Sequence, residues 1–190
     1  MILKQEAARE GWICWFTGLS GSGKTTTALA LTDALCKDQR KVELLDGDEL
    51  RTVIGSGLGF SREDRMENIR RIVYIAKLLS RNGITVVVST ISPYHEMRRY
   101  ARKELQQFVE IYVDCPLEEC ERRDPKGLYR KTRQHQIEHF TGITDVYEPP
   151  EQADITINTI SQTPEANAAI IRSWLHRNRT ITETEGRIKE

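Results

Sequence analysis

Residues 12–37, WICWFTGLSGSGKTTTALALTDALCK, contain the signal that decides the fold. The apolar run Trp12–Thr17 is typical of a short strand that is buried on both faces. A glycine-rich turn follows it, and Lys24–Lys37 then has the composition of a helix. Residues 18–25 match the pattern G-x-x-x-x-G-K-[ST] in full, and they stand between a strand and a helix, as a phosphate-binding loop requires.

Each position of this loop has a chemical task. The glycines allow backbone angles that direct successive N–H groups into one anion-sized hollow, and the start of the helix adds its positive end. Lys24 is expected to reach the β- and γ-phosphates of ATP, and the Thr25 hydroxyl is expected to ligate Mg²⁺. The predicted ATP site consists of Gly18, Leu19, Ser20, Gly21, Ser22, Gly23, Lys24 and Thr25.

The rest of the chain alternates short apolar runs with helix-like segments, which predicts a parallel sheet with helices on both faces. Ser61 is a candidate N-cap for a long helix that ends near Asn82, because apolar residues recur at helical spacing after it. We expect the other strands at 42–45, 84–89, 109–113 and 155–157, and the other helices at 93–107, from 116 onward and at 165–176.

The residues beyond the loop favour a small kinase over a GTPase or a motor ATPase. Those proteins usually place an aspartate at the end of an apolar strand, whereas strand 84–89 ends in Ser89-Thr90, and the chain has no guanine-reading N-K-x-D motif. Asp46-Gly47-Asp48 instead supplies carboxylates at the sheet edge where ligands bind in such folds. A carboxylate there can orient magnesium-bound water or accept a proton from an acceptor hydroxyl. A polar turn without function is the alternative.

We therefore predict a single α/β domain over residues 1–190, with a parallel sheet between two layers of helices. The resemblance to P-loop kinases implies the three-layer fold of that class, with a strand order of 2-3-1-4-5. Residues 122–133 carry six basic residues against one acidic, and they open a polar segment that runs to about 150. Cations that close over the phosphates neutralise charge and exclude water, so this segment is a predicted mobile lid. A solvated basic face is the alternative. Residues 179–190 are expected to be a polar, frayed tail.

The composition limits the partners and the location. Lys+Arg and Asp+Glu are both 28, so the net charge is zero and implies no general attraction to nucleic acid or membrane. The apolar strings are far shorter than the roughly 20 residues that span a bilayer. The four cysteines form no C-x-x-C pair and lie in or beside apolar runs, as buried thiols in a reducing compartment do. We expect a soluble, cytoplasmic protein.

Six segments, taken in order, resemble the adenylyl-sulfate kinase family, whose members phosphorylate the ribose 3′-hydroxyl of adenosine 5′-phosphosulfate (APS). The similarity covers roughly residues 10–160, and the P-loop is the one segment that is specific by itself. The segments are GLSGSGKT (18–25), LDGDELR (45–51), LGFSREDRMENIRR (58–71), ISP (91–93), DPKGLY (124–129) and FTGI (140–143).

The resemblance implies a role for each matching residue. Lys24, Asp48 and Ser92 would be catalytic, with Asp48 near both magnesium and the attacking hydroxyl, so that Thr25 and Asp48 form the metal site. Ser92 matches a serine described in the family as a phosphoserine, although direct in-line transfer needs only positioning and charge stabilisation. The implied acceptor site consists of Asp48, Arg51, Phe60, Arg65, Asn68, Ile91, Ser92, Lys126, Gly127, Leu128 and Phe140, with the two phenylalanines enclosing the adenine.

The resemblance further implies a homodimer and a possible functional partner, ATP sulfurylase. Two departures from the family pattern, Thr90 before I-S-P and Ile54-Gly55-Ser56-Gly57 before L-G-F, lie near the implied acceptor site. They leave open a related enzyme that phosphorylates another nucleotide anhydride or a small alcohol. A nucleotide-binding subunit without activity is a second alternative. A panel of acceptors discriminates between these possibilities.

Overall fold

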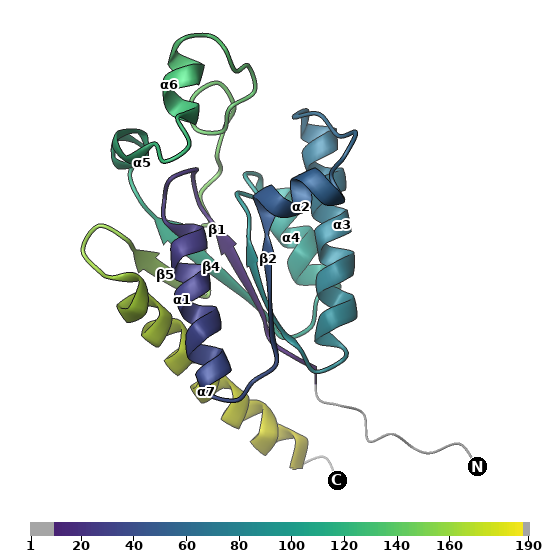
Figure 1. Cartoon of the computed structure of the whole chain (residues 1–190). Helices are drawn as coiled ribbons and strands as arrows, with labels where there is room; N and C mark the ends of the chain where they lie inside the picture. Colours follow the sequence, from purple (N-terminus) through teal and green to yellow (C-terminus); the bar gives the residue numbers. More distant parts are fainter. Residues whose placement is uncertain (1–9, 188–190) are drawn as a thin grey trace.

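The computed structural model describes residues 10–187, with side-chain detail for residues 10–178 (Figure 1). Strands and helices alternate along the chain, as the sequence predicts. The elements are β1 (Ile13–Thr17), α1 (Lys24–Lys37), β2 (Val42–Asp46), α2 (Gly47–Val53), α3 (Arg62–Ser80), β3 (Thr85–Ser89), α4 (His95–Glu104), β4 (Phe108–Asp114), α5 (Leu117–Arg123), α6 (Leu128–Arg133), β5 (Ile155–Asn158) and α7 (Pro164–Arg187).

The strands form one parallel sheet in the order β2-β3-β1-β4-β5, which confirms the predicted order. Strand β1 is central, and its Cys14 pairs with Val87 of β3 and with Val109 of β4. After β1 the chain builds β2 and β3 on one side and later β4 and β5 on the other. Such a switch in direction opens a crevice beyond the carboxyl ends of the central strands, and the P-loop leaves β1 at this edge.

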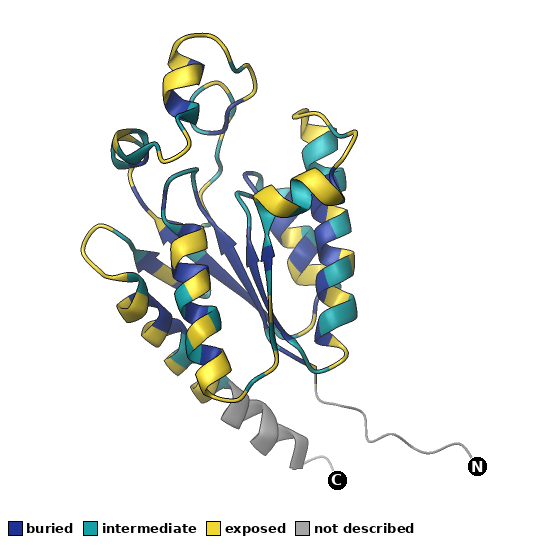
Figure 2. Cartoon of the chain, viewed as in Figure 1, coloured by how far each residue is buried: buried dark blue, intermediate teal, exposed yellow. Residues whose placement is uncertain are grey.

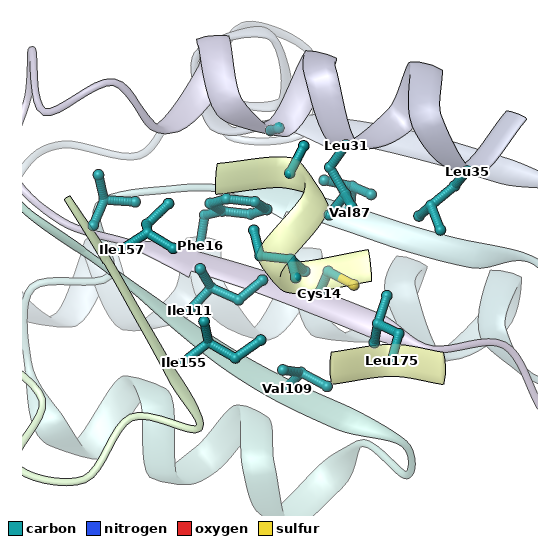
Figure 3. Close-up of a cluster of buried hydrophobic side chains, with 14 residues drawn as sticks. Cys14, Phe16, Leu31, Leu35, Val87, Val109, Ile111, Ile155, Ile157 and Leu175 are labelled. Carbon is teal, nitrogen blue, oxygen red and sulfur yellow. The ribbon is translucent and has the colours of Figure 1, made fainter. Parts of the chain in front are cut away.

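Alternate residues of β1 face opposite helical layers, as the two-residue period of a strand requires. Cys14 and Phe16 belong to a buried cluster with Leu31 of α1 and Leu175 of α7 (Figure 3). Full burial of side chains of this size contributes about 1.5–3 kcal/mol each, so this layer stabilises the sheet on one face.

The other face of the sheet packs against α3 and α4. Ile13 and Trp15 belong to a second buried cluster with Ile72 of α3 and Met97 of α4. The inner strands β1, β3 and β4 are buried almost throughout, whereas the edge strand β2 is only partly buried and the outer faces of the helices are exposed (Figure 2). None of the helices in the described part of the chain has the length and apolarity needed to cross a membrane. The predicted three-layer arrangement is therefore confirmed.

Helix α3 begins as its sequence predicts. The Ser61 side chain caps it by accepting a hydrogen bond of 3.1 Å from the backbone N–H of Asp64. The helix ends at Ser80, close to the predicted end at Asn82. Besides α6, a helix within the segment expected to be a polar lid, three other elements differ from the prediction. Helix α4 spans His95–Glu104 rather than 93–107, and α7 continues to Arg187, beyond the predicted end at 176 and into the segment expected to fray.

The third difference is α2, a helix that the sequence did not indicate. Asp46 is its N-cap, because its carboxylate accepts N–H bonds from Asp48 at 2.9 Å and from Glu49 at 3.4 Å. The helix has seven residues and none of them is buried, so it carries no apolar periodicity that could have revealed it. The Asp46-Gly47-Asp48 segment is therefore the start of a helix as well as the end of a strand.

Between β4 and β5 the chain forms a cap above the carboxyl edge of the sheet, with α5 next to the P-loop and α6 farther out (Figure 1). The cap has a small core of its own, made by Cys115, Cys120, Tyr129 and Phe140. The Tyr129 hydroxyl donates to the Ser20 carbonyl at 2.9 Å, which ties the cap to the P-loop. This is the segment predicted as a lid, and its mobility remains a prediction.

Candidate active site

The P-loop needs glycine at two positions, because a side chain there would be disfavoured by the backbone φ angle and would clash with neighbouring atoms. Gly21 and Gly23 have φ angles of 74° and 98°, in the left-handed region that other residues rarely adopt. A Cβ at Gly21 would lie 2.9 Å from the Cys120 carbonyl oxygen, and one at Gly23 would lie 3.0 Å from the Thr159 side chain. Helix α1 then starts at Lys24 with no side-chain cap, so its first N–H groups are available to an anion.

Several carbonyl groups of this loop are engaged by the rest of the chain. The Ser20 carbonyl accepts from Tyr129, and the Ser22 carbonyl accepts from the Thr159 hydroxyl at 2.7 Å. The Ser22 hydroxyl is buried and has no hydrogen-bond partner among the described residues. With its carbonyls held in this way, the loop can present N–H groups to phosphate oxygens.

Lys24 lies against the loop that it belongs to. Its ammonium donates to the carbonyls of Gly18 at 2.9 Å and Leu19 at 2.6 Å, and the residue is only 8% exposed. Burial lowers the pKa of Lys24 to about 8, because the charged form loses solvation. The side chain does not point into open solvent. It is instead held among the carbonyls at the edge of the phosphate-binding hollow.

Thr25 lies in a cluster of oxygen atoms at the carboxyl ends of two strands. Its hydroxyl donates to Asp46 Oδ2 at 3.0 Å and lies 3.1 Å from the Ser89 hydroxyl. Asp46 and Ser89 are register partners in β2 and β3, which explains how they come together. A set of carboxylate and hydroxyl oxygens is the kind that Mg²⁺ prefers. The chemistry of this cluster therefore fits a magnesium ion.

Asp48, the predicted metal carboxylate, has a different neighbour. It is exposed and forms an ion pair with Lys126. Lys126 lies in the turn between α5 and α6, and this turn continues through Gly127, whose φ is 65°, to Leu128 at the start of α6. Leu128 packs against the small core of the cap. The predicted lid residues therefore contact the predicted site on α2 through the ion pair between Lys126 and Asp48.

Arg65 joins α3 to the segment that follows α6. Its guanidinium donates to the Thr141 hydroxyl at 2.9 Å and forms an ion pair of 2.8 Å with Asp145. It also donates to the carbonyls of Phe60 and His139, at 2.8 Å each. Most of its donors are therefore occupied by the protein. Binding of an anionic acceptor by Arg65 would require an exchange of some of these partners.

Arg51 of α2 and Asn68 of α3 both lie beside Gly55, in the turn between the two helices. Arg51 donates to the carbonyl of Gly59, and its pKa is lowered mainly by burial, with a contribution from Arg65. Asn68 is 6% exposed, and its side-chain oxygen is buried without a hydrogen-bond partner in the described part of the chain. Because buried polar atoms are rarely left unpaired, this oxygen is a candidate contact for a ligand donor.

The two phenylalanines of the predicted adenine site have unlike environments. Phe60 is 56% exposed, and the guanidinium carbons of Arg51 and Arg65 lie 4.5 and 5.6 Å from its ring centre. Phe140 is 8% exposed and packs edge-to-face on Tyr129 at 4.9 Å. Phe60 is thus free to stack on a base, whereas Phe140 already has a structural role in the cap.

Two side chains of β1 hold the I-S-P loop (residues 91–93) by hydrogen bonds. The Thr17 hydroxyl donates to the Ile91 carbonyl at 2.7 Å, and the Trp15 indole N–H donates to the Ser92 hydroxyl at 3.1 Å. Ser92 is 2% exposed and has a φ of 39°, which is strained for a residue with a side chain. Its hydroxyl is therefore part of a buried contact.

Sequence reasoning missed two residues of this site. Asp46 was noticed only as part of the D-G-D motif. Ser89 was considered only because it stands where GTPases and motor ATPases usually have an aspartate. A hydroxyl at the end of an apolar strand is a weak signal. Only the register between β2 and β3 shows that both residues meet Thr25.

A surface groove of about 450 Å³ lies along α3, beside the end of α2. Its lining consists of Ile54, Glu67, Arg70, Arg71, Tyr74 and Ile75. None of the P-loop residues and none of the predicted acceptor residues lines it. The anion-binding loop and its charged neighbours, rather than the presence of a groove, therefore identify the active site.

A parallel sheet in this order, a complete P-loop and an oxygen cluster beside Thr25 define a P-loop kinase. The profile of the adenylylsulphate kinase family matches residues 10–158. The adenylyl-sulfate kinase of Pseudomonas aeruginosa is 51% identical over 168 residues, which cover 87% of this chain and 86% of the relative. That of a Synechococcus strain is also 51% identical, over 171 residues that cover 90% of this chain and 98% of the relative.

The solved structures agree with the sequences. The APS kinase of Mycobacterium tuberculosis, in complex with AMPPNP and APS, matches with a TM-score of 0.86 and 42% identity, over 88% of this chain and 98% of that chain. The protein described here belongs to the adenylyl-sulfate kinase family.

Proposed function

We infer that the chain transfers the γ-phosphoryl group of ATP to the 3′-hydroxyl of APS, giving 3′-phosphoadenylyl sulfate and ADP. The observation that carries this function is family membership over most of the chain, together with an intact P-loop. The reaction activates sulfate for assimilation.

On the donor side, residues 18–25 would hold the phosphates of ATP through backbone N–H groups. Lys24 lies beside that hollow and would exchange its carbonyl partners for phosphate oxygens. Thr25, with Asp46 and Ser89 beside it, would hold Mg²⁺ directly or through water. A bound magnesium ion would neutralise charge on the phosphate oxygens.

On the acceptor side, positive charge and one aromatic face gather beside α3. Arg51 and Arg65 would bind the phosphosulfate and ribose, and Phe60 between them would stack on the adenine. The unpaired oxygen of Asn68 would accept a hydrogen bond from the acceptor. Ile91 would line the same site, and Phe140 would complete it from the cap.

Asp48 is the carboxylate proposed to receive the proton of the attacking 3′-hydroxyl. In the structure it is paired with Lys126, so the base and the lid are already linked by charge. When a nucleotide binds, Lys126 can turn from Asp48 to the phosphates, which would free the carboxylate and close the lid. Gly127 and Leu128 would move with it as parts of the same turn.

For Ser92 we propose a positioning role and direct transfer. Its hydroxyl is buried and bonded to Trp15, a poor arrangement for a side chain that would have to attack the γ-phosphorus and then pass the group on. In-line attack by the acceptor hydroxyl needs no covalent intermediate.

Three further expectations remain predictions from the family resemblance and the composition. They are assembly as a homodimer, a functional association with ATP sulfurylase, and a cytoplasmic location. The size of the assembly can be measured by light scattering on the purified chain.

The test of the function is turnover with ATP and Mg²⁺. We expect APS to be phosphorylated at its 3′-hydroxyl, with AMP, shikimate and gluconate as much poorer acceptors in the same assay.

Thr90, a departure from the family pattern, packs its side chain against Gly47 at the start of α2, where a Cβ on Gly47 would lie 3.1 Å from the Thr90 hydroxyl. Better turnover of another acceptor than of APS would overturn the assignment.

A further inference from the structure

Arg98 of α4 is a buried arginine that contacts three other segments of the chain. The residue is 2% exposed. Its Nε forms an ion pair of 2.9 Å with Glu110 of β4, and its Nη1 donates to the Ser92 carbonyl at 2.7 Å. Its Nη2 donates to the Glu148 carbonyl at 2.6 Å and lies 2.9 Å from His95 Nδ1. One guanidinium therefore joins the sheet, the I-S-P loop and the C-terminal part of the cap.

The contact with Glu148 is reinforced by that residue's other groups. Its backbone N–H donates to the Pro93 carbonyl at 2.8 Å, and its carboxylate accepts from the backbone N–H of His95 at 2.6 Å. The preceding Tyr147 places its hydroxyl 3.0 Å from that of Thr17, which itself donates to the Ile91 carbonyl. The end of the lid segment and the I-S-P loop are thus fastened to each other and to β1.

The burial of the Arg98 charge is tolerated because the carboxylate of Glu110 neutralises it. Glu110, its carboxylate partner, is 7% exposed and also accepts from Arg102 at 3.2 Å. Arg102 in turn pairs with Asp154, which accepts from the backbone N–H of Glu110. A buried ion pair of this kind stabilises little by itself, but it determines where the charged groups lie. Here the remaining donors of Arg98 are directed to the two loop carbonyls.

We propose that Arg98 is a positioning residue for the acceptor. It holds the strained Ser92 backbone and links the I-S-P loop to the end of the lid, so that the acceptor surface and the closing segment share one anchor. The inference rests on the proposed function, because the I-S-P loop matters only if it lines the acceptor site. No contact of Arg98 involves the P-loop, so ATP binding should be largely independent of it.

Arg98→Lys tests this role, since lysine keeps the charge for Glu110 but cannot bridge both carbonyls. The matched control is Arg102→Lys, which alters the same ion network at a residue that contacts neither Ser92 nor Glu148. We expect Arg98→Lys to raise the KM for APS about tenfold, comparable with the loss of one charged hydrogen bond, and to change the KM for ATP less than about twofold. Arg102→Lys should leave both constants near those of the wild type.

Thermal unfolding of each variant separates positioning from stability. If Arg98→Lys does not fold, the double variant Arg98→Gln/Glu110→Gln removes both charges together and should show the same selective rise in the KM for APS. A lowered melting temperature with an unchanged KM for APS would overturn the proposal, and so would equal effects on APS and ATP. Failure of the wild type to phosphorylate APS would instead overturn the proposed function.

Discussion

The unlike environments of Phe60 and Phe140 predict that their alanine variants will fail in different ways. Phe140 is 8% exposed within the core of the cap, and replacing a buried phenylalanine by alanine costs about 3–5 kcal/mol of folding free energy. Phe60 is 56% exposed, and its main contacts are two arginines, each of which stabilises such a site by about 0.5–1 kcal/mol. Phe60→Ala should therefore lower stability by only about 1–2 kcal/mol.

Acceptor binding should show the opposite ranking: the Phe60 variant, which loses little stability, should lose more affinity for APS. Stacking of a base on an aromatic ring contributes about 1–3 kcal/mol, so Phe60→Ala should weaken APS binding roughly tenfold to a hundredfold. The affinity for ATP should change by less than about twofold, because the P-loop is formed by another part of the chain. Phe60→Leu keeps an apolar side chain without the aromatic face, and it should bind APS almost as weakly as the alanine variant.

Two titrations and one unfolding experiment measure these effects. APS and a non-hydrolysable ATP analogue are titrated separately against the wild type and the variants, and urea unfolding gives the stability of each. Phe140→Leu, which retains most of the buried volume, controls for the packing loss in Phe140→Ala. If folded Phe60→Ala binds APS as the wild type does, Phe60 does not stack on the adenine. An unchanged urea midpoint for Phe140→Ala would refute the structural role of that ring.

Other predictions concern the catalytic groups. Lys24→Met should reduce turnover by about 10²–10³-fold through lost charge stabilisation; activity within threefold of the wild type would rule out this loop as catalytic. Because burial lowers the pKa of Lys24 to about 8, the unfolded state binds the extra proton between pH 8 and the ordinary lysine pKa; wild-type stability should therefore rise with pH in this range relative to Lys24→Met, as urea unfolding can show. Ser92→Ala should retain turnover within about tenfold; loss of activity together with a phosphoserine detected by mass spectrometry would contradict direct transfer. Asp46→Asn should raise the Mg²⁺ concentration needed for half-maximal turnover several-fold; a larger shift for Asp48→Asn would assign the metal carboxylate to Asp48 instead.

The regular elements and the donor loop could be predicted because their signals are local. The β-branched run 85–88 requires burial on both faces, Ser61 supplies the cap that starts α3, and the glycine pattern of 18–25 satisfies both the angles and the space of a phosphate-binding loop. Each of these features depends on neighbours within a few residues. The seven-residue α2 was missed because it has no buried side chain, and the capping role of Asp46 was hidden within a motif read for its chemistry.

The partners within the site were decided by tertiary structure. Thr25 meets Asp46 and Ser89 because β2 and β3 pair in one particular register, and no local pattern records a register. Ser92 is buried, and its hydroxyl accepts a hydrogen bond from Trp15, which lies 77 residues earlier in the chain.

The sequence alone determined the phosphate-binding loop, the parallel sheet and the order of its layers, since backbone angles and apolar periodicity are properties of short segments. Only the folded chain decided which carboxylate faces Thr25, which phenylalanine is exposed, and that Arg98 joins the I-S-P loop to the cap. These contacts join side chains from distant segments. Their geometry is set by strand register and by the packing of helices on the sheet, which depend on the whole domain.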